Sequence, residues 1–265
     1  MEAASGHHVE ESPQRTAGRY EREPVEEPTY EDWMPGEPEE GGCELLWPAE
    51  GEGDFAYAYM GQALAEAMAE KGYCVIQTRV PAADRESVID ETYEAQSWLL
   101  PKKQFESAYL GIGSKDKYFM LPDTDYEIPY DADGNLTVDR GLLRCDGILT
   151  NTCLLLEQLA SPTLGYEPWG RMNCMVRMPF AGQQEEEELR PKPLGSEDYT
   201  DGRVVGHLNF VERRRELMIL CVENEGGELT LFPKSLSGEE SKPIRIPLAR
   251  NKLICLNHQT MSMRR

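Results

Sequence analysis

After residue 168 the chain breaks into short apolar runs, and this pattern constrains its fold more than any other feature. Six runs of strand-forming residues follow at near-regular spacing, separated by loops rich in Gly, Pro, Asn and Glu. Such runs are typical of antiparallel sheets that close into a barrel or pack as a sandwich. The longest interruption, residues 181–203, is expected to be an acidic loop between the first two strands. The six runs are RMNCMVRM, VVGHLNFVE, ELMILCVEN, GELTLFP, KPIRIPL and KLICLNHQ.

The first half of the chain has helical periodicity instead. Residues 55–72 combine strong helix formers with a stop at Gly72, and the β-branched and aromatic run at 73–80 predicts a strand. Residues 81–100 predict a second helix, and residues 139–160 a third that is capped by Asp139. Helices followed by many short strands indicate an α+β fold, in which a helical layer supports a barrel or sandwich.

We expect one folded domain over residues 55–265, with the helical layer at 55–165 and the barrel strands at 169–265. The final strand is short for a barrel and is interpreted as truncated. Residues 1–54 carry sixteen acidic and three basic side chains and are rich in Pro and Gly, which predicts a disordered acidic tail. The tail either solubilises the chain or docks on a protein partner through its one apolar cluster, Tyr30, Trp33 and Met34.

Composition excludes several classes of function. The formal net charge of −21 repels phosphate backbones, so no nucleic-acid partner is expected. No run approaches the ~20 apolar residues of a membrane span, and the amino terminus has no signal-peptide pattern. The seven cysteines form no CxxC pair and are interpreted as small buried hydrophobes of a reducing compartment, so a cytoplasmic location is expected.

Several short segments of the sequence, in the same order along the chain, resemble segments of the iron(II)/2-oxoglutarate dioxygenases of the prolyl-hydroxylase branch. The resemblance covers roughly residues 60–263. It implies a double-stranded β-helix of the jelly-roll type with N-terminal supporting helices, and Fe(II) and 2-oxoglutarate as cofactors if the protein is active. The words are ALAEAMAEKGYCVIQTRVPAADRESV, VRMPFAG, GHLNF, GGELTLFP and IPLARNKLICL.

A closer likeness is to the domain that precedes the ketosynthase in dinoflagellate-type polyketide synthases. It rests on FESAYLGIG, GRMNCMVRMPF, GHLNFVERRRELMILCV and GGELTLFPK, and Glu106, Tyr109, Leu110 and Gly111 match a Glu-rich Tyr-Leu-Gly word of that region. The likeness implies an accessory module associated with polyketide synthase machinery. The ketosynthase itself is absent, so no condensation activity is expected.

The word GHLNF, residues 206–210, is the main candidate for a metal site. On a strand, His207 and Asn209 would point to the same face. A facial triad binds Fe(II) through two imidazoles and one carboxylate, and leaves other positions open for substrates. The resemblance implies that His207 is the first histidine and that Asn209 replaces the carboxylate with a neutral, weaker donor. The alternative is that His207 is an ordinary hydrogen-bonded residue of a strand.

The second histidine of the triad has no clear counterpart. The resemblance places it near Ser262 or Met263, whereas the nearest histidine, His258, lies roughly five residues earlier. A shift by an odd number of residues along a strand turns a side chain to the opposite face. The site is therefore expected to be degenerate, with His207, Asn209 and His258 as its candidate ligands.

Two arginines are candidates for binding the co-substrate. Arg177 alternates with apolar residues on its predicted strand and is expected to point inward beside His207, where it could bind an anion. Arg213 belongs to the basic cluster VERRREL, which either faces a dicarboxylate from inside the barrel or forms a solvated turn.

Two functions remain open. The first is a non-catalytic oxygenase-like module that binds a protein partner, through the acidic tail or a barrel face, or a small-molecule ligand. The second is an active Fe(II)/2-oxoglutarate-dependent dioxygenase that hydroxylates a protein or a small molecule.

Overall fold

The structure is a computed structural model, and its chain is described at residues 36–49, 52–95, 97–121, 140–168, 170–224, 226–234 and 242–264. Residues 1–35 of the expected tail and the expected cap Asp139 lie outside these ranges. Within them, no helix combines the length and the apolar character needed to cross a bilayer.

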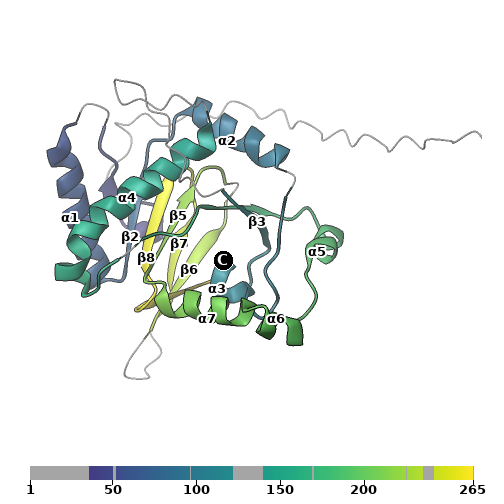
Figure 1. Ribbon diagram of the computed structural model, residues 1–265. Helices are drawn as coiled ribbons and strands as arrows, with labels where there is room; N and C mark the ends of the chain where they lie inside the picture. The colour runs from purple at the N-terminus through teal and green to yellow at the C-terminus, as the bar shows by residue number, and fades with distance from the viewer. Residues whose placement is uncertain are drawn as a thin grey trace, which may run out of the picture. The chain divides into compact units, whose positions relative to one another are not determined.

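A four-stranded sheet forms the centre of the fold (Figure 1). Its strand order is β1-β2-β8-β5; β1 runs parallel to β2, and the other pairs are antiparallel. The strands are Leu45–Leu46 (β1), Tyr73–Gln77 (β2), Lys252–Asn257 (β8) and Glu216–Cys221 (β5).

Helices α1 (Asp54–Glu70) and α4 (Gly141–Leu164) cover one face of this sheet (Figure 1). Leu64, Met68 and Leu156 of the helices share an apolar cluster with every second residue of β2 and β8. Helix α2 (Ala82–Glu94) packs beside the start of α4, where a side chain on Gly141 would collide with the backbone of α2. These three helices overlap the helices expected at residues 55–72, 81–100 and 139–160.

A second sheet covers the opposite face of the central sheet. Its order is β7-β6-β9, and Leu229, Leu231 and Ile246 pack against Val75 and Ile254 of the central sheet. This arrangement confirms the α+β class, with two facing sheets and helices on one side. The three strands are Glu228–Pro233 (β6), Ile244–Pro247 (β7) and Met261–Arg264 (β9).

Strands β3 (Asp116–Met120) and β4 (Met175–Pro179) form a separate antiparallel pair. β3 comes directly after the short helix α3 (Glu106–Leu110), and β4 comes after α4. Five of the six runs predicted as strands are strands in the structure. The strand prediction for the sixth run, VVGHLNFVE, is wrong, because residues Arg203–Arg213 form helix α7.

Local sequence explains why α7 is a helix. Gly202 takes a left-handed φ of 76° directly before it, which is costly for other residues and suits a chain reversal. Its packed residues His207, Phe210 and Arg214 recur at helical rather than strand spacing. The preceding acidic stretch is not a plain loop either, since it contains α5 (Gln183–Leu189) and α6 (Ser196–Thr200).

Residues 36–49 belong to the fold, so the expected disordered segment 1–54 extends too far. They contain the 3₁₀ turn η2 (Pro38–Glu40) and strand β1, which pairs with β2. Cys43 and Trp47 are buried in the two apolar clusters on either face of the central sheet.

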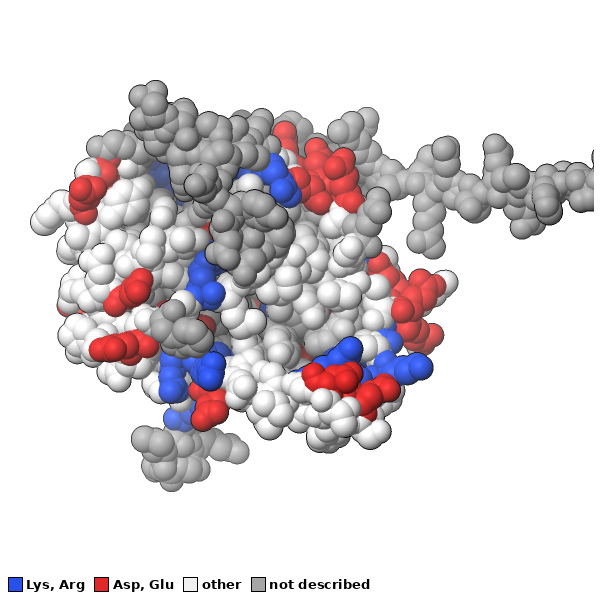
Figure 2. Space-filling model, viewed as in Figure 1, with Lys and Arg blue, Asp and Glu red and all other residues white. Residues whose placement is uncertain are grey.

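Figure 2 shows acidic and basic side chains intermingled on the face in view, without a continuous basic patch.

Candidate functional site

Helix α7 packs on α3 through an aromatic face. The imidazole of His207 stacks on the ring of Phe105, with centroids 3.9 Å apart and planes 17° apart. Tyr109 and Phe210 stack at 4.5 Å, and the Arg214 guanidinium lies 5.5 Å from the centroid of the Phe210 ring. Stacked rings and a cation over a ring face each add to the gain from burial. These contacts fix which side of α7 faces the protein.

His207 and Asn209 do not share a face, and the expectation that they do is wrong. Successive residues of an α-helix are about 100° apart, so two positions turn the side chain by about 200°. His207 is half-buried against Phe105, whereas Asn209 is exposed. The carboxamide of Asn209 therefore points away from the imidazole, and the two cannot bind one ion together.

The second candidate histidine, His258, lies in the turn between β8 and β9. Its backbone N–H donates to the carbonyl oxygen of Arg215 at 2.7 Å, and the Lys234 ammonium donates to its carbonyl oxygen. Burial lowers the pKa of the imidazole to about 4, and the nearby charges of Arg214 and Lys234 contribute in the same direction. His258 is therefore neutral near pH 7.

Arg214 connects the two histidines electrostatically. Burial lowers the pKa of His207, and the charge of Arg214 adds to that shift as it does at His258. The Nδ1 atom of His207 is buried and has no hydrogen-bond partner among the described residues. The sequence pointed to the run Arg213 to Arg215 but did not single out Arg214, because three successive arginines give no sign of which one turns inward. Helical spacing from His207 would have identified it.

The position expected for the second histidine holds apolar contacts instead. Met263 lies on β9 opposite Leu231 and is 6% exposed, inside the core between the two sheets. Its neighbour Ser262 donates to the carbonyl oxygen of Phe232 at 3.4 Å. A thioether in an apolar core is a poor ligand for Fe(II), which favours nitrogen and oxygen donors.

The residues present do not fit an Fe(II) site. Over the described ranges, no three or more His, Cys, Asp or Glu side chains gather closely enough to hold a metal ion. The two histidines lie on a helix and in a turn rather than on facing strands. A neutral amide on the far side of α7 supplies no charge to balance a divalent cation.

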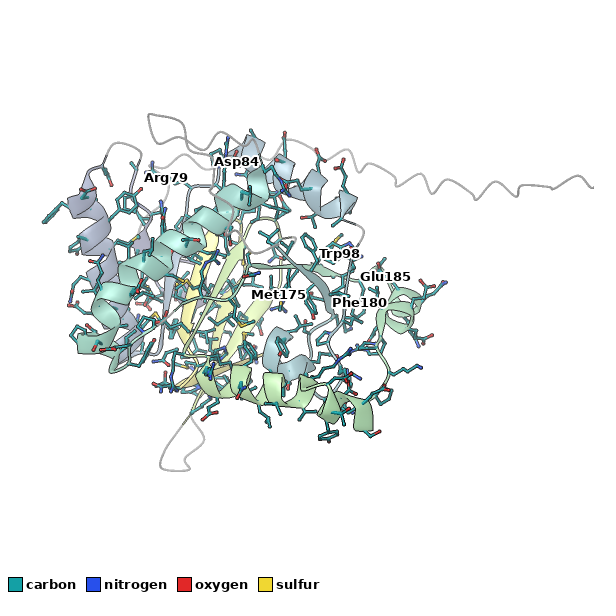
Figure 3. All side chains as sticks on the ribbon, viewed as in Figure 1. Arg79, Asp84, Trp98, Met175, Phe180 and Glu185 are labelled. Atoms are coloured by element: carbon teal, nitrogen blue, oxygen red, sulfur yellow. The ribbon has the colours of Figure 1, made fainter. Side chains whose placement is uncertain are left out.

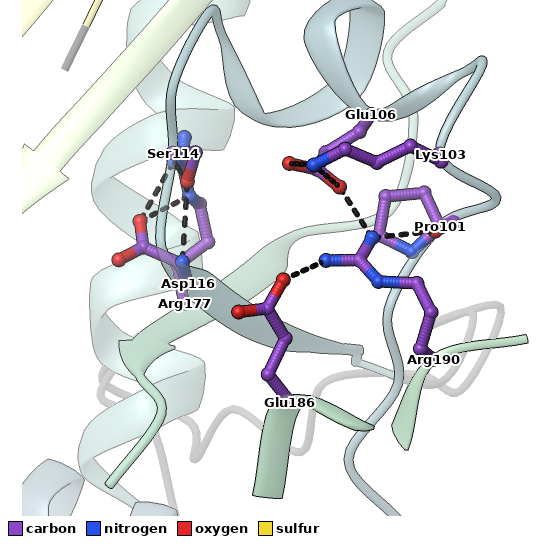
Figure 4. Close-up of polar contacts among 8 residues, drawn as sticks. All are labelled: Pro101, Lys103, Glu106, Ser114, Asp116, Arg177, Glu186 and Arg190. Atoms are coloured by element: carbon purple, nitrogen blue, oxygen red, sulfur yellow. Dashed lines mark hydrogen bonds and ion pairs between the residues drawn. The ribbon is translucent and has the colours of Figure 1, made fainter. Parts of the chain in front are cut away.

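Arg177 of β4 is held by the adjoining strand (Figure 4). Its Nε and Nη2 donate to one carboxylate oxygen of Asp116 at 3.2 and 2.7 Å. Nη2 also donates to Ser114 Oγ at 3.1 Å and to the carbonyl oxygen of Leu110 at 2.8 Å. Arg177 thus points toward an internal carboxylate and the end of α3. A role in binding an external anion stays a prediction.

The remaining candidates have different surroundings. Arg213 is the last residue of α7 and its side chain is exposed.

Glu106, which belongs to the Tyr-Leu-Gly segment, is buried and accepts hydrogen bonds from Arg190 and Lys103 (Figure 4). Arg190 also pairs with Glu186 of α5, so Glu106 anchors the acidic insertion to α3.

Lys117 makes a second connection between the insertion and β3. Its ammonium lies 2.5 Å from the carboxylate of Glu185 and 4.8 Å from the centroid of the Trp98 ring. Figure 3 shows Trp98, Phe180 and Glu185 gathered in this region. An open hollow of about 620 Å³ lies nearby, lined by Lys115, Phe180, Gln183 and Arg190 among others. Its lining combines charged side chains, such as Glu186 and Arg190, with the apolar side chains of Pro179 and Phe180.

No protein-family profile and no curated protein matches this chain. Among solved structures, it is similar to a prolyl hydroxylase from Trichoplax adhaerens in complex with a peptide fragment of the hypoxia inducible factor oxygen degradation domain. The identity is 14%, the coverage is 81% of this chain and 87% of that one, and the TM-score is 0.48. A putative oxygenase from Shewanella oneidensis is similar at 11% identity, with coverage of 83% and 81% and a TM-score of 0.30.

Proposed function

We propose that this chain is a non-catalytic oxygenase-like module, which binds a protein partner or a small ligand and does not assemble an iron site. One observation carries the proposal: residues Arg203–Arg213 form a helix, which turns Asn209 away from His207. A facial triad requires its ligands to converge on one side of the ion. From opposite sides of α7, His207 and Asn209 cannot both belong to one such set.

The core between the two sheets supports the same proposal. The side chains of Met261, Met263 and Leu231 fill it with apolar atoms. A buried divalent cation in such surroundings would lack the charged and polar ligands that offset its desolvation. We propose that the space between the sheets serves stability, and that binding takes place on an outer surface.

The nature of the partner is a further part of this proposal. Association with polyketide synthase machinery rests on the words shared with the domain before the ketosynthase. A protein partner bound through the acidic segment or a barrel face rests on the charge and the apolar cluster of residues 1–54. Both parts are tested by a pull-down of polyketide synthase modules, once with the chain that carries residues 1–54 and once with a chain that lacks them.

Anaerobic calorimetry tests the absence of an iron site. The 265-residue chain is titrated with Fe(II) in the presence of 2-oxoglutarate, beside His207→Ala. We expect no binding in the micromolar range that depends on His207, and no succinate formed on adding oxygen. Binding that is lost in His207→Ala and accompanied by metal-dependent succinate would overturn the proposal.

The second candidate function is an active Fe(II)/2-oxoglutarate-dependent hydroxylase. One observation favours it: His207 has a buried Nδ1 atom without a partner among the described residues, and both histidines are held neutral, as metal ligands are. In this candidate, His207 and His258 bind iron, and the co-substrate is oriented by Arg177 or by the run Arg213 to Arg215. Loss of Fe(II) binding in both His207→Ala and His258→Ala would support it.

A further inference from the structure

Two cations lie close together where the end of α7 meets the turn between β8 and β9. The guanidinium of Arg214, directly after α7, donates to the carbonyl oxygen of Ala108. The ammonium of Lys234, directly after β6, donates to the carbonyl oxygen of His258. The N–H of His258 donates in turn to the carbonyl oxygen of Arg215 at 2.7 Å, so one turn holds both cationic segments.

Electrostatic effects among these side chains show that they share one environment. Burial lowers the pKa of Lys234, and the charge of Arg214 lowers it further. The pKa of His258 is lowered by burial and by the charges of both cations, and that of His207 by burial and by Arg214. An added positive charge is therefore unfavourable at each of these groups. They surround a region of positive potential in a chain whose net charge is −21.

Neither cation is paired with a carboxylate of the described residues. By contrast, Lys117, Arg177 and Arg190 each bond to a carboxylate. A guanidinium has five N–H donors and an ammonium has three, and a carbonyl oxygen engages one donor of each cation here. Like charges held together away from water are unfavourable, and an anion bound between them offsets that repulsion.

The placement of the two cations favours a tetrahedral oxyanion. A guanidinium is a planar fork that binds two oxygens of one anion, whereas an ammonium is a point charge that binds a single oxygen. Arg214 and Lys234 follow different elements, so they approach an anion from two directions. A phosphate group offers three oxygens that do not lie in one plane with its phosphorus atom, whereas a carboxylate offers two oxygens in a plane.

We propose that Arg214 and Lys234 bind the phosphate group of a small phosphorylated molecule. The inference rests on the proposed function, for which it names a binding site and a ligand class. Lys234 is exposed and Arg214 is half-buried, so the ligand reaches both from the outer surface. A pair of cations suits one phosphate group, because the acidic remainder of the chain repels a polyanion such as nucleic acid.

Calorimetry with inorganic phosphate tests the ligand class. The 265-residue chain is titrated at low ionic strength, because salt screens the attraction, and at about pH 7.5, where phosphate is mostly dianionic. We expect a dissociation constant of about 1 mM or lower, and weaker binding of succinate. Succinate that binds more tightly than phosphate, or no phosphate binding up to about 10 mM, would overturn the proposal.

Substitution of single cations tests the site. Arg214→Gln and Lys234→Gln should each weaken phosphate binding at least about tenfold, because each loses a charge-assisted hydrogen bond. The matched control is Arg215→Gln, which removes the same charge one residue away. The charge of Arg215 acts on Tyr166, so we expect this variant to change the affinity by no more than about twofold.

Two further comparisons make the result unambiguous. Because Lys234 is exposed, Lys234→Gln separates a loss of binding from a loss of folding, and urea denaturation checks that Arg214→Gln is folded. Equal affinities in the wild type and both variants, or an equal loss in Arg215→Gln, would overturn the site. A chain that binds neither phosphate nor Fe(II) contradicts this inference alone, whereas Fe(II) binding through His207 contradicts the proposed function.

Discussion

The ammonium of Lys252 donates hydrogen bonds to the carbonyl oxygens of Gly41 and Gly42, at 2.6 and 3.1 Å. Lys252 begins β8 and is fully buried, and burial lowers its pKa. This contact joins residues 36–49 to the centre of the sheet.

Removing this buried donor should be costly. Lys252→Met keeps most of the volume but leaves two carbonyl groups without a charged donor, so we expect a loss of about 1–3 kcal/mol in the free energy of unfolding. Lys252→Ala adds a cavity and should lose more. Urea denaturation measures both. Lys103→Ala, which removes a side chain that is 69% exposed, serves as the control and should change stability by less than about 0.5 kcal/mol.

Two substitutions of Gly206 distinguish a helix from a strand at residues 203–213. A Cβ at Gly206 meets no atom within 4 Å, so substitution there is free of steric cost. In a helix, Gly206→Ala should stabilise the protein by about 0.5–1 kcal/mol, and Gly206→Val by less. In a strand the order reverses, because valine favours strands. Chemical denaturation of the two variants gives the order; a more stable Val variant would contradict helix α7.

The Arg177–Asp116 pair should contribute strongly to the packing of β3 on β4. Both side chains are mostly buried, at 15% and 5% exposure. Breaking one partner of a buried pair leaves an uncompensated charge, so Asp116→Ala should destabilise the protein by about 3 kcal/mol. The exposed pair Arg245–Glu228, 3.7 Å apart, is a matched control between strands. A double-mutant cycle on it should give a coupling close to zero.

The depressed pKa of His258 makes stability depend on pH. The unfolded chain binds a proton near pH 6.5, whereas the folded chain resists it down to about pH 4. The unfolded state therefore binds more protons in this window, and stability falls as the pH falls. We expect His258 to account for a loss of about 2 kcal/mol between about pH 7.5 and about pH 5.

His258→Gln isolates that contribution, because glutamine does not titrate. Urea unfolding of the variant and the wild type at both pH values should show a smaller pH dependence in the variant. Equal slopes for the two proteins would contradict a buried neutral imidazole at position 258.

The strands were predictable wherever a short, continuous apolar run was bounded by polar or turn-forming residues. ELMILCVEN and KLICLNHQ correspond to β5 and β8, and the helix expected at 55–72 corresponds to α1. VVGHLNFVE was ambiguous because its apolar residues fit both a period of about 2 and a period of about 3.6. The short helices of the acidic insertion carry few apolar residues, so their periodicity gave no signal; their ion pairs with Glu106 and Lys117 are long-range.

By itself, the sequence determined the α+β class and the order of most elements, since these follow from local residue type and spacing. Only the tertiary structure decided that His207 faces Phe105 and that Arg177 binds Asp116. Each of these depends on contacts between residues distant in the chain, whose free energies outweigh the weak local preference for a strand at residues 204–212.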